Sequence, residues 1–117
     1  MRLLIADSDP LVLKSLRICL RDQKDFVVMG LIADSMDAIE ICRADEPDVV
    51  LLDARLDGVA TTQQIKSLCP NIQVIMLTTF GDTPEVRRAI IAGAKGYIVK
   101  ADKISSIVEK IRTMIFA

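Results

Sequence analysis

Polar side chains stand directly after four of the apolar stretches in this chain: Asp7, Asp53, Thr78 and Lys100. Two carboxylates that lie close together attract Mg²⁺, because this ion prefers oxygen ligands. A carboxylate beside such a metal can also act as a nucleophile. A lysine and a hydroxyl can hold the remaining oxygens of a phosphoryl group. The four residue types therefore predict phosphate chemistry, provided that the fold brings them together.

Each of these residues has an ordinary explanation when it is taken alone. Lys100 is of a type that usually lies on the surface, and Thr78 is a β-branched residue at the end of a strand. The nearby Asp9 is most simply a helix cap. Asp53 is harder to explain, since a carboxylate that closes a buried stretch costs free energy unless it has a partner. The hypothesis of a shared site therefore rests on the set of four.

Short apolar runs alternate with longer amphipathic segments along the whole chain. The runs show no polar alternation, which is typical of parallel strands covered on both faces. They are Leu3–Ala6, Phe26–Ala33, Val49–Leu52, Ile72–Leu77 and Tyr97–Val99. Five strand–helix units with short connections predict right-handed crossovers and a parallel α/β sheet with helices on both faces. Ligands bind at the carboxyl ends of such strands, where the four polar residues are expected to meet.

Residues that cap helices predict where the helices begin. The expected N-caps are Asp9, Ser35, Asp82 and Asp102. Proline suits the first turn after Asp9 and Asp82, and Glu85 gives the second of these the spacing of a capping box. In the last helix, apolar residues recur at three- and four-residue spacing, which predicts one buried face. They are Ile104, Ile107, Val108, Ile111, Met114 and Ile115.

The composition excludes several other classes of protein. The chain has no histidine, which removes Ser-His-Asp and Cys-His nucleophiles, histidine-bound zinc and an internal phosphohistidine. Cys19, Cys42 and Cys69 lack metal-ligand spacing and sit among apolar neighbours, so we expect reduced thiols and a cytoplasmic location. A net charge of −1 gives no electrostatic reason for nucleic-acid binding. No apolar stretch is long enough for a membrane span, so we expect no membrane association.

Four segments carry a resemblance to a known family: LLIADSDPLV (3–12), VVLLDARLDG (49–58), VIMLTT (74–79) and AGAKGYIVK (92–100). In this order they resemble the successive motifs of the receiver domains of bacterial response regulators, over almost the whole chain. The segments 77–80 and 93–97 are most similar to the LuxR-type (NarL-like) transcription factors. The resemblance implies a flavodoxin-like, doubly wound sheet of five parallel strands in the order 2-1-3-4-5, with five helices on both faces. Residues 1–117 are then expected to be a single receiver domain without an output domain.

The resemblance also implies how the site works. Asp53 would accept a phosphoryl group from the phosphohistidine of a sensor histidine kinase. Asp7, Asp53 and the backbone carbonyl of Arg55 would hold Mg²⁺. The family usually has a second acidic residue where this chain has Ser8, whose hydroxyl would bind the metal only weakly or through water. We therefore expect a lower affinity for Mg²⁺ than the family motif gives.

Two further residues would carry the signal away from the acceptor. Thr78 would move to bond the phosphoryl oxygen and Tyr97 would change rotamer with it, while Lys100 would pair with the carboxylate or its phosphoryl adduct. The chain would then be a phosphoacceptor that assists its own phosphotransfer and dephosphorylation, and not an enzyme. DNA binding would require a C-terminal helix-turn-helix domain, which these residues do not contain.

Two alternatives to a phosphorylated receiver stay open at this point. The first alternative is an atypical receiver that signals by protein–protein contacts without phosphorylation. It is favoured by Ser8 and by the loop after Asp53. In that loop Leu56 is followed at once by Asp57-Gly58, about three residues early and without the usual proline. A more distant possibility is a phosphatase similar to the haloacid dehalogenases, with Asp7 as nucleophile and Asp9 as acid/base, although the final acidic pair of that family is missing.

Leu11 and Ile18 face outward on the first helix and could belong to a homodimer contact.

Overall fold

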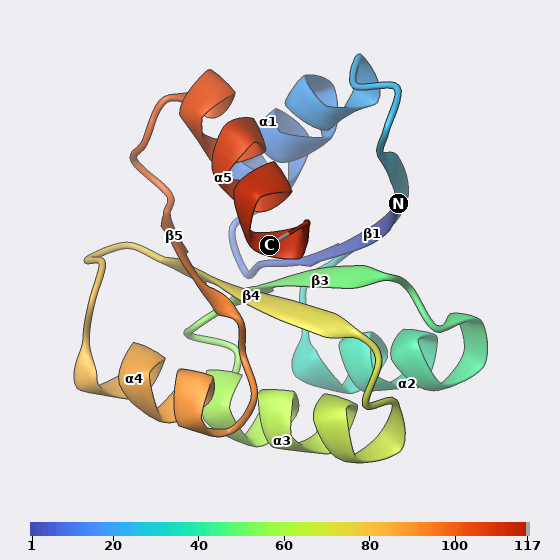
Figure 1. Cartoon of the computed structure of the whole chain (residues 1–117), viewed down its shortest axis with the longest axis vertical. Helices are drawn as coiled ribbons and strands as arrows, with labels where there is room; N and C mark the ends of the chain where they lie inside the picture. Colours follow the sequence, from blue (N-terminus) through green and yellow to red (C-terminus); the bar gives the residue numbers. More distant parts are fainter. Residues whose placement is uncertain (117) are drawn as a thin grey trace.

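The computed structural model describes residues 1–116, apart from the side chain of Ile104, and strands alternate with helices along this part of the chain (Figure 1). The strands are β1 (Arg2–Ala6), β2 (Val27–Ile32), β3 (Val49–Asp53), β4 (Gln73–Thr78) and β5 (Gly96–Val99). The helices are α1 (Pro10–Arg21), α2 (Ser35–Asp45), α3 (Gly58–Leu68), α4 (Pro84–Ile91) and α5 (Ile104–Ile115).

All the strand pairs are parallel, and the order across the sheet is β2-β1-β3-β4-β5. Helices α1 and α5 cover one face of the sheet, and α2, α3 and α4 cover the other (Figure 1). The predicted fold class, strand order and two-sided helix cover are therefore confirmed.

The central strands are buried on both faces, which explains why their sequences show no polar alternation. Successive side chains of a strand point to opposite faces of the sheet. In β1, Leu3 and Ile5 pack with α1 and α5, whereas Leu4 and Ala6 pack with α2, α3 and α4. The core is built almost entirely from aliphatic side chains. Because the central strands are packed on both faces, their carboxyl ends are held in place. The candidate site lies at these ends.

The first predicted cap is confirmed, and the second is wrong by one residue. The carboxylate of Asp9 accepts a hydrogen bond from the backbone N–H of Leu11 at 2.9 Å, and Pro10 opens α1. Helix α2 is capped by Asp34, whose carboxylate accepts from a backbone N–H three residues later at 2.8 Å. Ser35 is the first residue of the helix. Both residue types are good caps, and the aspartate stands where the backbone is still extended.

The other two predicted caps are also wrong, because their carboxylates bind basic side chains instead. Asp82 pairs with Arg87 at 3.0 Å, and the cap of α4 is the hydroxyl of Thr83. Asp102 pairs with Lys110, and α5 begins without a side-chain cap. A cation five or eight residues further along the chain competes with the helix N-terminus for the carboxylate.

The predicted inner face of α5 is confirmed for the side chains that the structure describes. Ile107, Val108, Ile111 and Ile115 are buried, and Met114 is partly buried against the same cluster. Ile104, which we also expected on this face, lies outside the described side chains.

The three thiols are free, as expected, and Cys42 and Cys69 are buried. Burial raises the pKa of the Cys42 thiol to about 12, so this thiol stays protonated. None of the helices in residues 1–116 is long and apolar enough to cross a membrane.

Candidate functional site

Three of the predicted residues meet at the carboxyl edge of the sheet. Asp7 follows β1 and Asp53 ends β3, which is the neighbouring strand. The Nζ atom of Lys100 lies 2.7 Å from Oδ2 of Asp7 and 3.1 Å from Oδ1 of Asp53. The exposed fractions of these side chains are 0% for Asp7, 1% for Asp53 and 10% for Lys100. One ammonium group therefore bridges two buried carboxylates.

Lys100 reaches the carboxylates from the other side of β4. Its backbone N–H donates to the carbonyl oxygen of Thr78 at 2.9 Å, which fixes the start of the side chain beside the end of that strand. Because β4 lies between β5 and β3 in the sheet, the aliphatic stem must cross the end of β4 to bring the ammonium to Asp53. Burial of most of this side chain leaves Lys100 little freedom to leave the site.

The Asp53 carboxylate is held from several directions. Its Oδ1 accepts from the backbone N–H of Arg55 at 3.0 Å. Its Oδ2 accepts from the hydroxyl of Ser8 at 3.0 Å and from the backbone N–H of Ser8 at 3.3 Å. Ser8 holds the position where the family motif usually has a second acidic residue, and here it donates to the carboxylate of Asp53.

The side chain of Arg55 is a site residue that sequence reasoning missed. We expected only its backbone carbonyl to take part, yet its guanidinium lies over both carboxylates. Nε is 3.4 Å from Oδ1 of Asp53, and Nη2 is 3.4 Å from Oδ2 of Asp53 and 3.9 Å from Oδ1 of Asp7. A basic residue two positions after a buried aspartate was the one available signal, but the conformation of the loop decides where it points.

The two carboxylates differ in acidity because their donors differ. Burial, the largest influence, raises the pKa of Asp7, and the bonds from Lys100 and the backbone of Asp9 offset it only in part. Burial acts on Asp53 as well, but the bonds from the Arg55 backbone, Lys100 and the Ser8 backbone outweigh it and lower the pKa of Asp53. Asp53 is therefore ionised at neutral pH.

Among residues 1–116, the side chains of Thr78 and Tyr97 make no hydrogen bond to this cluster. The hydroxyl of Thr78 donates to the carbonyl of Gly81 at 3.3 Å and accepts from the N–H of Phe80 at 3.3 Å. Tyr97 is partly buried on β5, in register with Met76 of β4. In this structure, therefore, the threonine hydroxyl is engaged by its own loop and not by the carboxylates.

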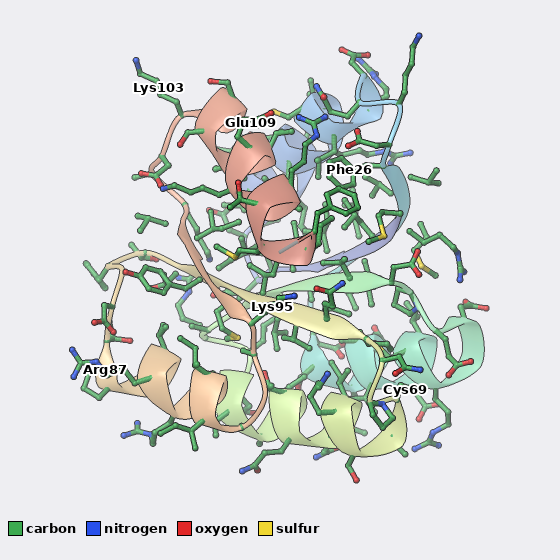
Figure 2. The ribbon with its side chains drawn as sticks, viewed as in Figure 1. Phe26, Cys69, Arg87, Lys95, Lys103 and Glu109 are labelled. Atoms are coloured by element: carbon green, nitrogen blue, oxygen red, sulfur yellow. The ribbon has the colours of Figure 1, made fainter. Side chains whose placement is uncertain are left out.

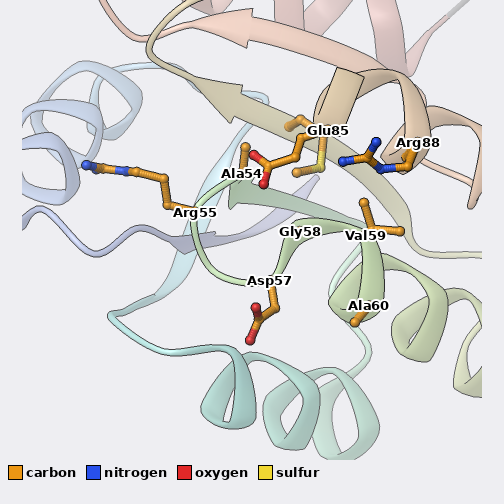
Figure 3. A pocket seen from close by; sticks show the side chains of 9 residues that line it. Ala54, Arg55, Asp57, Gly58, Val59, Ala60, Glu85 and Arg88 are labelled. Atoms are coloured by element: carbon orange, nitrogen blue, oxygen red, sulfur yellow. The ribbon is translucent and has the colours of Figure 1, made fainter. Parts of the chain in front are cut away.

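The short loop after Asp53 turns directly into α3. The N–H of Leu56 donates to the carbonyl of Asp53 at 3.0 Å, and Asp57 has a positive φ of 49°. Gly58 opens the helix where a Cβ atom would lie 2.6 Å from Cε of Met76, so a larger residue does not fit there without a shift. Beside this loop lies a hollow of about 520 Å³ (Figure 3), lined by Ala54, Arg55, Asp57, Gly58, Val59, Ala60, Met76, Glu85 and Arg88.

The sequence is similar to proteins of a well-populated family. Residues 3–112 match the response regulator receiver domain. The chain is 37% identical over 114 residues to the response regulator protein VraR of Staphylococcus saprophyticus, covering 95% of this chain and 54% of that protein. It is 34% identical over 114 residues to the transcriptional regulatory protein YxjL of Bacillus subtilis, covering 95% and 52%. This chain belongs to the response regulator receiver family, as predicted, and it spans about half the length of the curated relatives it matches.

Solved structures agree on the fold. The receiver domain of the response regulator NarL from Mycobacterium tuberculosis superposes with a TM-score of 0.90 at 24% identity, covering 99% of this chain and 96% of that one. A DNA-binding response regulator of the LuxR family from Staphylococcus aureus gives a TM-score of 0.88 at 24% identity, covering 97% and 98%. These likenesses concern the fold, and they fall within the subfamily that the sequence resembles.

Receiver domains generally bind Mg²⁺ at the phosphorylation site, so the donor set must be compared with that ion. Among residues 1–116 no group of three or more acidic, histidine or cysteine side chains is arranged to hold a metal. Two buried carboxylates do converge, and Oδ2 of Asp7 has no hydrogen-bond partner in the described part of the chain apart from its ionic contact with Lys100. Such a pair of hard oxygen donors fits a weakly held dication.

Proposed function

We propose that this chain is the phosphoaccepting receiver of a two-component system and that Asp53 takes a phosphoryl group from the phosphohistidine of a sensor histidine kinase. An oxygen of the Asp53 carboxylate would attack phosphorus, so that a P–O bond forms as the P–N bond breaks and the electron pair returns to the imidazole. The observation that carries the proposal is that the buried Asp53 carboxylate lies at the carboxyl edge of the sheet, 3.1 Å from the ammonium of Lys100. A carboxylate can act as the nucleophile in phosphoryl transfer, and the nearby cation would attract the incoming group.

Lys100 and Thr78 would receive the transferred group. The ammonium of Lys100 already contacts Asp53. After transfer it would donate a charge-assisted hydrogen bond to a phosphoryl oxygen. The hydroxyl of Thr78 would have to leave the carbonyl of Gly81 to reach another phosphoryl oxygen. Tyr97 on the adjacent strand would then change rotamer, which would pass the change to the surface of α4, β5 and α5.

Mg²⁺ would be held by Asp7, Asp53 and the backbone carbonyl of Arg55. The ion would neutralise negative charge on the phosphoryl oxygens as the group approaches the carboxylate. Ser8 offers a hydroxyl in place of a third carboxylate, which would make the affinity low, either directly or through water.

Receiver domains are generally signalling domains without enzymatic activity. We propose the same here, with no turnover of a free substrate. The haloacid-dehalogenase alternative would require Asp9 as the acid/base, but its carboxylate caps α1 through the N–H of Leu11 at 2.9 Å. That engagement supports a receiver over a phosphatase.

A second candidate is a receiver that signals without phosphorylation. Ser8, the short loop and the guanidinium of Arg55 over the carboxylates favour it. Under this proposal the chain would act through its contacts with other proteins alone.

The experiment that separates these candidates is incubation with acetyl phosphate and Mg²⁺ followed by intact mass spectrometry. We expect one phosphoryl adduct on the unaltered protein and none on Asp53→Asn. Asp57→Asn is the matched control, since it removes an exposed carboxylate of the same loop, and it should keep the adduct. An unmodified parent protein under saturating donor would favour the second candidate.

The surroundings of the receiver are proposals as well. Residues 1–117 would form one receiver domain, and a DNA-binding helix-turn-helix domain would lie outside them. The free thiols support a cytoplasmic protein.

Leu11 and Ile18 are exposed on α1 and would contribute to a homodimer contact. Sedimentation of Ile18→Glu should then show less assembly than the parent at the same concentration, and equal assembly would contradict the contact.

A further inference from the structure

We propose that the guanidinium of Arg55 is an internal cation that competes with Mg²⁺ for the carboxylates of Asp7 and Asp53, so that the metal binds fully only after this side chain has moved away. This inference deepens the proposed function, because it rests on the same two carboxylates being the metal site.

The charges of the cluster are already balanced without a metal. Asp7 and Asp53 carry two negative charges, and Lys100 and Arg55 carry two positive charges within 3.9 Å of them. The usual third carboxylate is replaced by Ser8, which adds no charge. A dication entering this arrangement would give a buried cluster an excess of positive charge, which is costly where the dielectric constant is low.

The donors of the protein also occupy the oxygens that a metal would use. Both oxygens of Asp53 are engaged, Oδ1 with the backbone and Nε of Arg55 and Oδ2 with Ser8 and Nη2 of Arg55. Oδ1 of Asp7 accepts from the N–H of Asp9 at 2.8 Å. Only the guanidinium among these donors is both charged and free to leave without unfolding the backbone.

Exposure separates the two cations of the site. The side chain of Lys100 is 10% exposed, whereas that of Arg55 is 58% exposed. Lys100 is thus a fixed part of the cluster, while Arg55 covers it from the solvent side. A salt bridge of this kind is weak because its cation remains hydrated. A metal can therefore displace it.

The short loop provides room for the displaced side chain. Figure 3 shows Arg55 pointing away from Glu85 and Arg88, on the other side of the loop. The hollow beside the loop has a volume of about 520 Å³, and Arg55, Asp57 and Glu85 are among the residues that line it. A rotation of the Arg55 side chain toward the hollow would take the guanidinium from Asp7 and Asp53 toward Asp57 and Glu85.

The test is titration with MgCl₂ alone, without a phosphoryl donor, followed by calorimetry. We compare the parent, Arg55→Gln and the matched control Arg88→Gln, which removes the same charge from another residue that lines the hollow. Arg55→Gln should bind Mg²⁺ about fivefold more tightly, since an exposed ion pair is worth up to about 1 kcal/mol. Arg88→Gln should change the affinity by less than about twofold because screening weakens its effect.

A second measurement uses the unaltered protein. Mg²⁺ should shift the Nε–Hε signal of Arg55 in ¹⁵N-resolved NMR spectra, with the same midpoint as calorimetry, and leave that of Arg88 unchanged. Equal affinities in Arg55→Gln and the parent, or a static Arg55 signal at saturation, would overturn the inference. Absence of Mg²⁺ binding in all three proteins would overturn it too.

These outcomes are independent of phosphorylation. Tighter Mg²⁺ binding in Arg55→Gln together with an unreactive Asp53 would leave this inference standing and remove the proposed function. An Asp53 adduct together with equal affinities would do the reverse.

Discussion

Two ionic clusters lie at opposite ends of the sheet, and they use their charges differently. At the carboxyl edge, Lys100 bridges Asp7 and Asp53, and these three side chains are at most 10% exposed. At the amino end, before β2, Arg112 of α5 pairs with Asp25 at 2.8 Å and with Glu109 at 2.6 Å. The side chains there are between 27% and 70% exposed.

The exposed cluster has a structural explanation. Arg112 ties α5 to the segment before β2, and its guanidinium also lies 5.4 Å from the centre of the Phe26 ring. Figure 2 shows Phe26 beside α5, the helix that carries Glu109. Each charge keeps much of its water, so the cluster costs little and contributes little.

The buried cluster has no such explanation. Removing two carboxylates and an ammonium from water costs several kcal/mol for each ion, and apolar residues of the same size would often be at least as stable. The function proposed above would explain why this arrangement is present, since it makes Asp53 a reactive carboxylate. The predictions below test this contrast, from the largest expected effect to the smallest.

Lys100→Met should be the most damaging change to stability. It leaves two buried carboxylates with only the exposed guanidinium of Arg55 as a cation, and loss of one partner of a buried pair costs about 3–5 kcal/mol. The free energy of unfolding, measured with urea, should fall by an amount of this order. A loss equal to that of Arg112→Met would show that the two clusters do not differ in the way we describe.

Replacing the two aspartates should change stability in opposite directions at pH 7. The pKa of Asp7 is raised, mainly by burial, so its ionised form costs stability and Asp7→Asn should stabilise the fold. The pKa of Asp53 is lowered, so its ionised form contributes stability and Asp53→Asn should destabilise the fold. Thermal unfolding of the two variants provides the measurement. Changes of the same sign would contradict the difference in acidity.

The same difference predicts a pH dependence. The pKa of Asp53 lies below the ordinary value of 3.8, so its contribution is present above 3.8 and is lost as the pH falls through its lower pKa. The pKa of Asp7 lies above 3.8, so the cost of its ionisation disappears as the pH falls from its raised pKa toward 3.8. The stability advantage of Asp7→Asn over the parent should therefore shrink as the solution is acidified through this range. An advantage that stays constant from neutral pH to 3.8 would contradict it.

Arg112→Met should have the smallest effect. The methionine side chain can still pack on Phe26, while the ion pairs of Arg112 with Asp25 and Glu109 are lost. We expect a small drop in the unfolding midpoint that vanishes at high salt, because exposed pairs are screened. A large drop that persists at high salt would show that this exposed cluster contributes strongly to stability, which would contradict the contrast between the two clusters.

Sequence reasoning reached the fold and the main site because both depend on strong, repeated patterns. Apolar runs without alternation indicated a sheet covered on both faces, and polar residues at the ends of β1, β3, β4 and β5 then had to share an edge. Details that depend on one residue or one rotamer were not accessible. Asp34 and Ser35 are both good caps, so the choice between them rests on the backbone angles of one residue.

The Arg55 guanidinium shows the same limit within the site. Its place over Asp53 depends on the turn that the short loop makes at Asp57, where φ is positive. A hydroxyl at Ser8 was expected to be a poor metal ligand, but its bond to Asp53 follows from the relative position of two strand ends. Contacts of this kind are properties of the folded chain and are not marked by spacing.

Reduction of the phosphorylated protein with borohydride tests the central claim most directly. An aspartyl phosphate is an acyl phosphate, which borohydride reduces to homoserine. After treatment with acetyl phosphate and Mg²⁺, peptide mass spectrometry should find homoserine at position 53 and aspartate at positions 7, 9 and 57. Homoserine at Asp7, or at none of these positions under saturating donor, would contradict the role of Asp53.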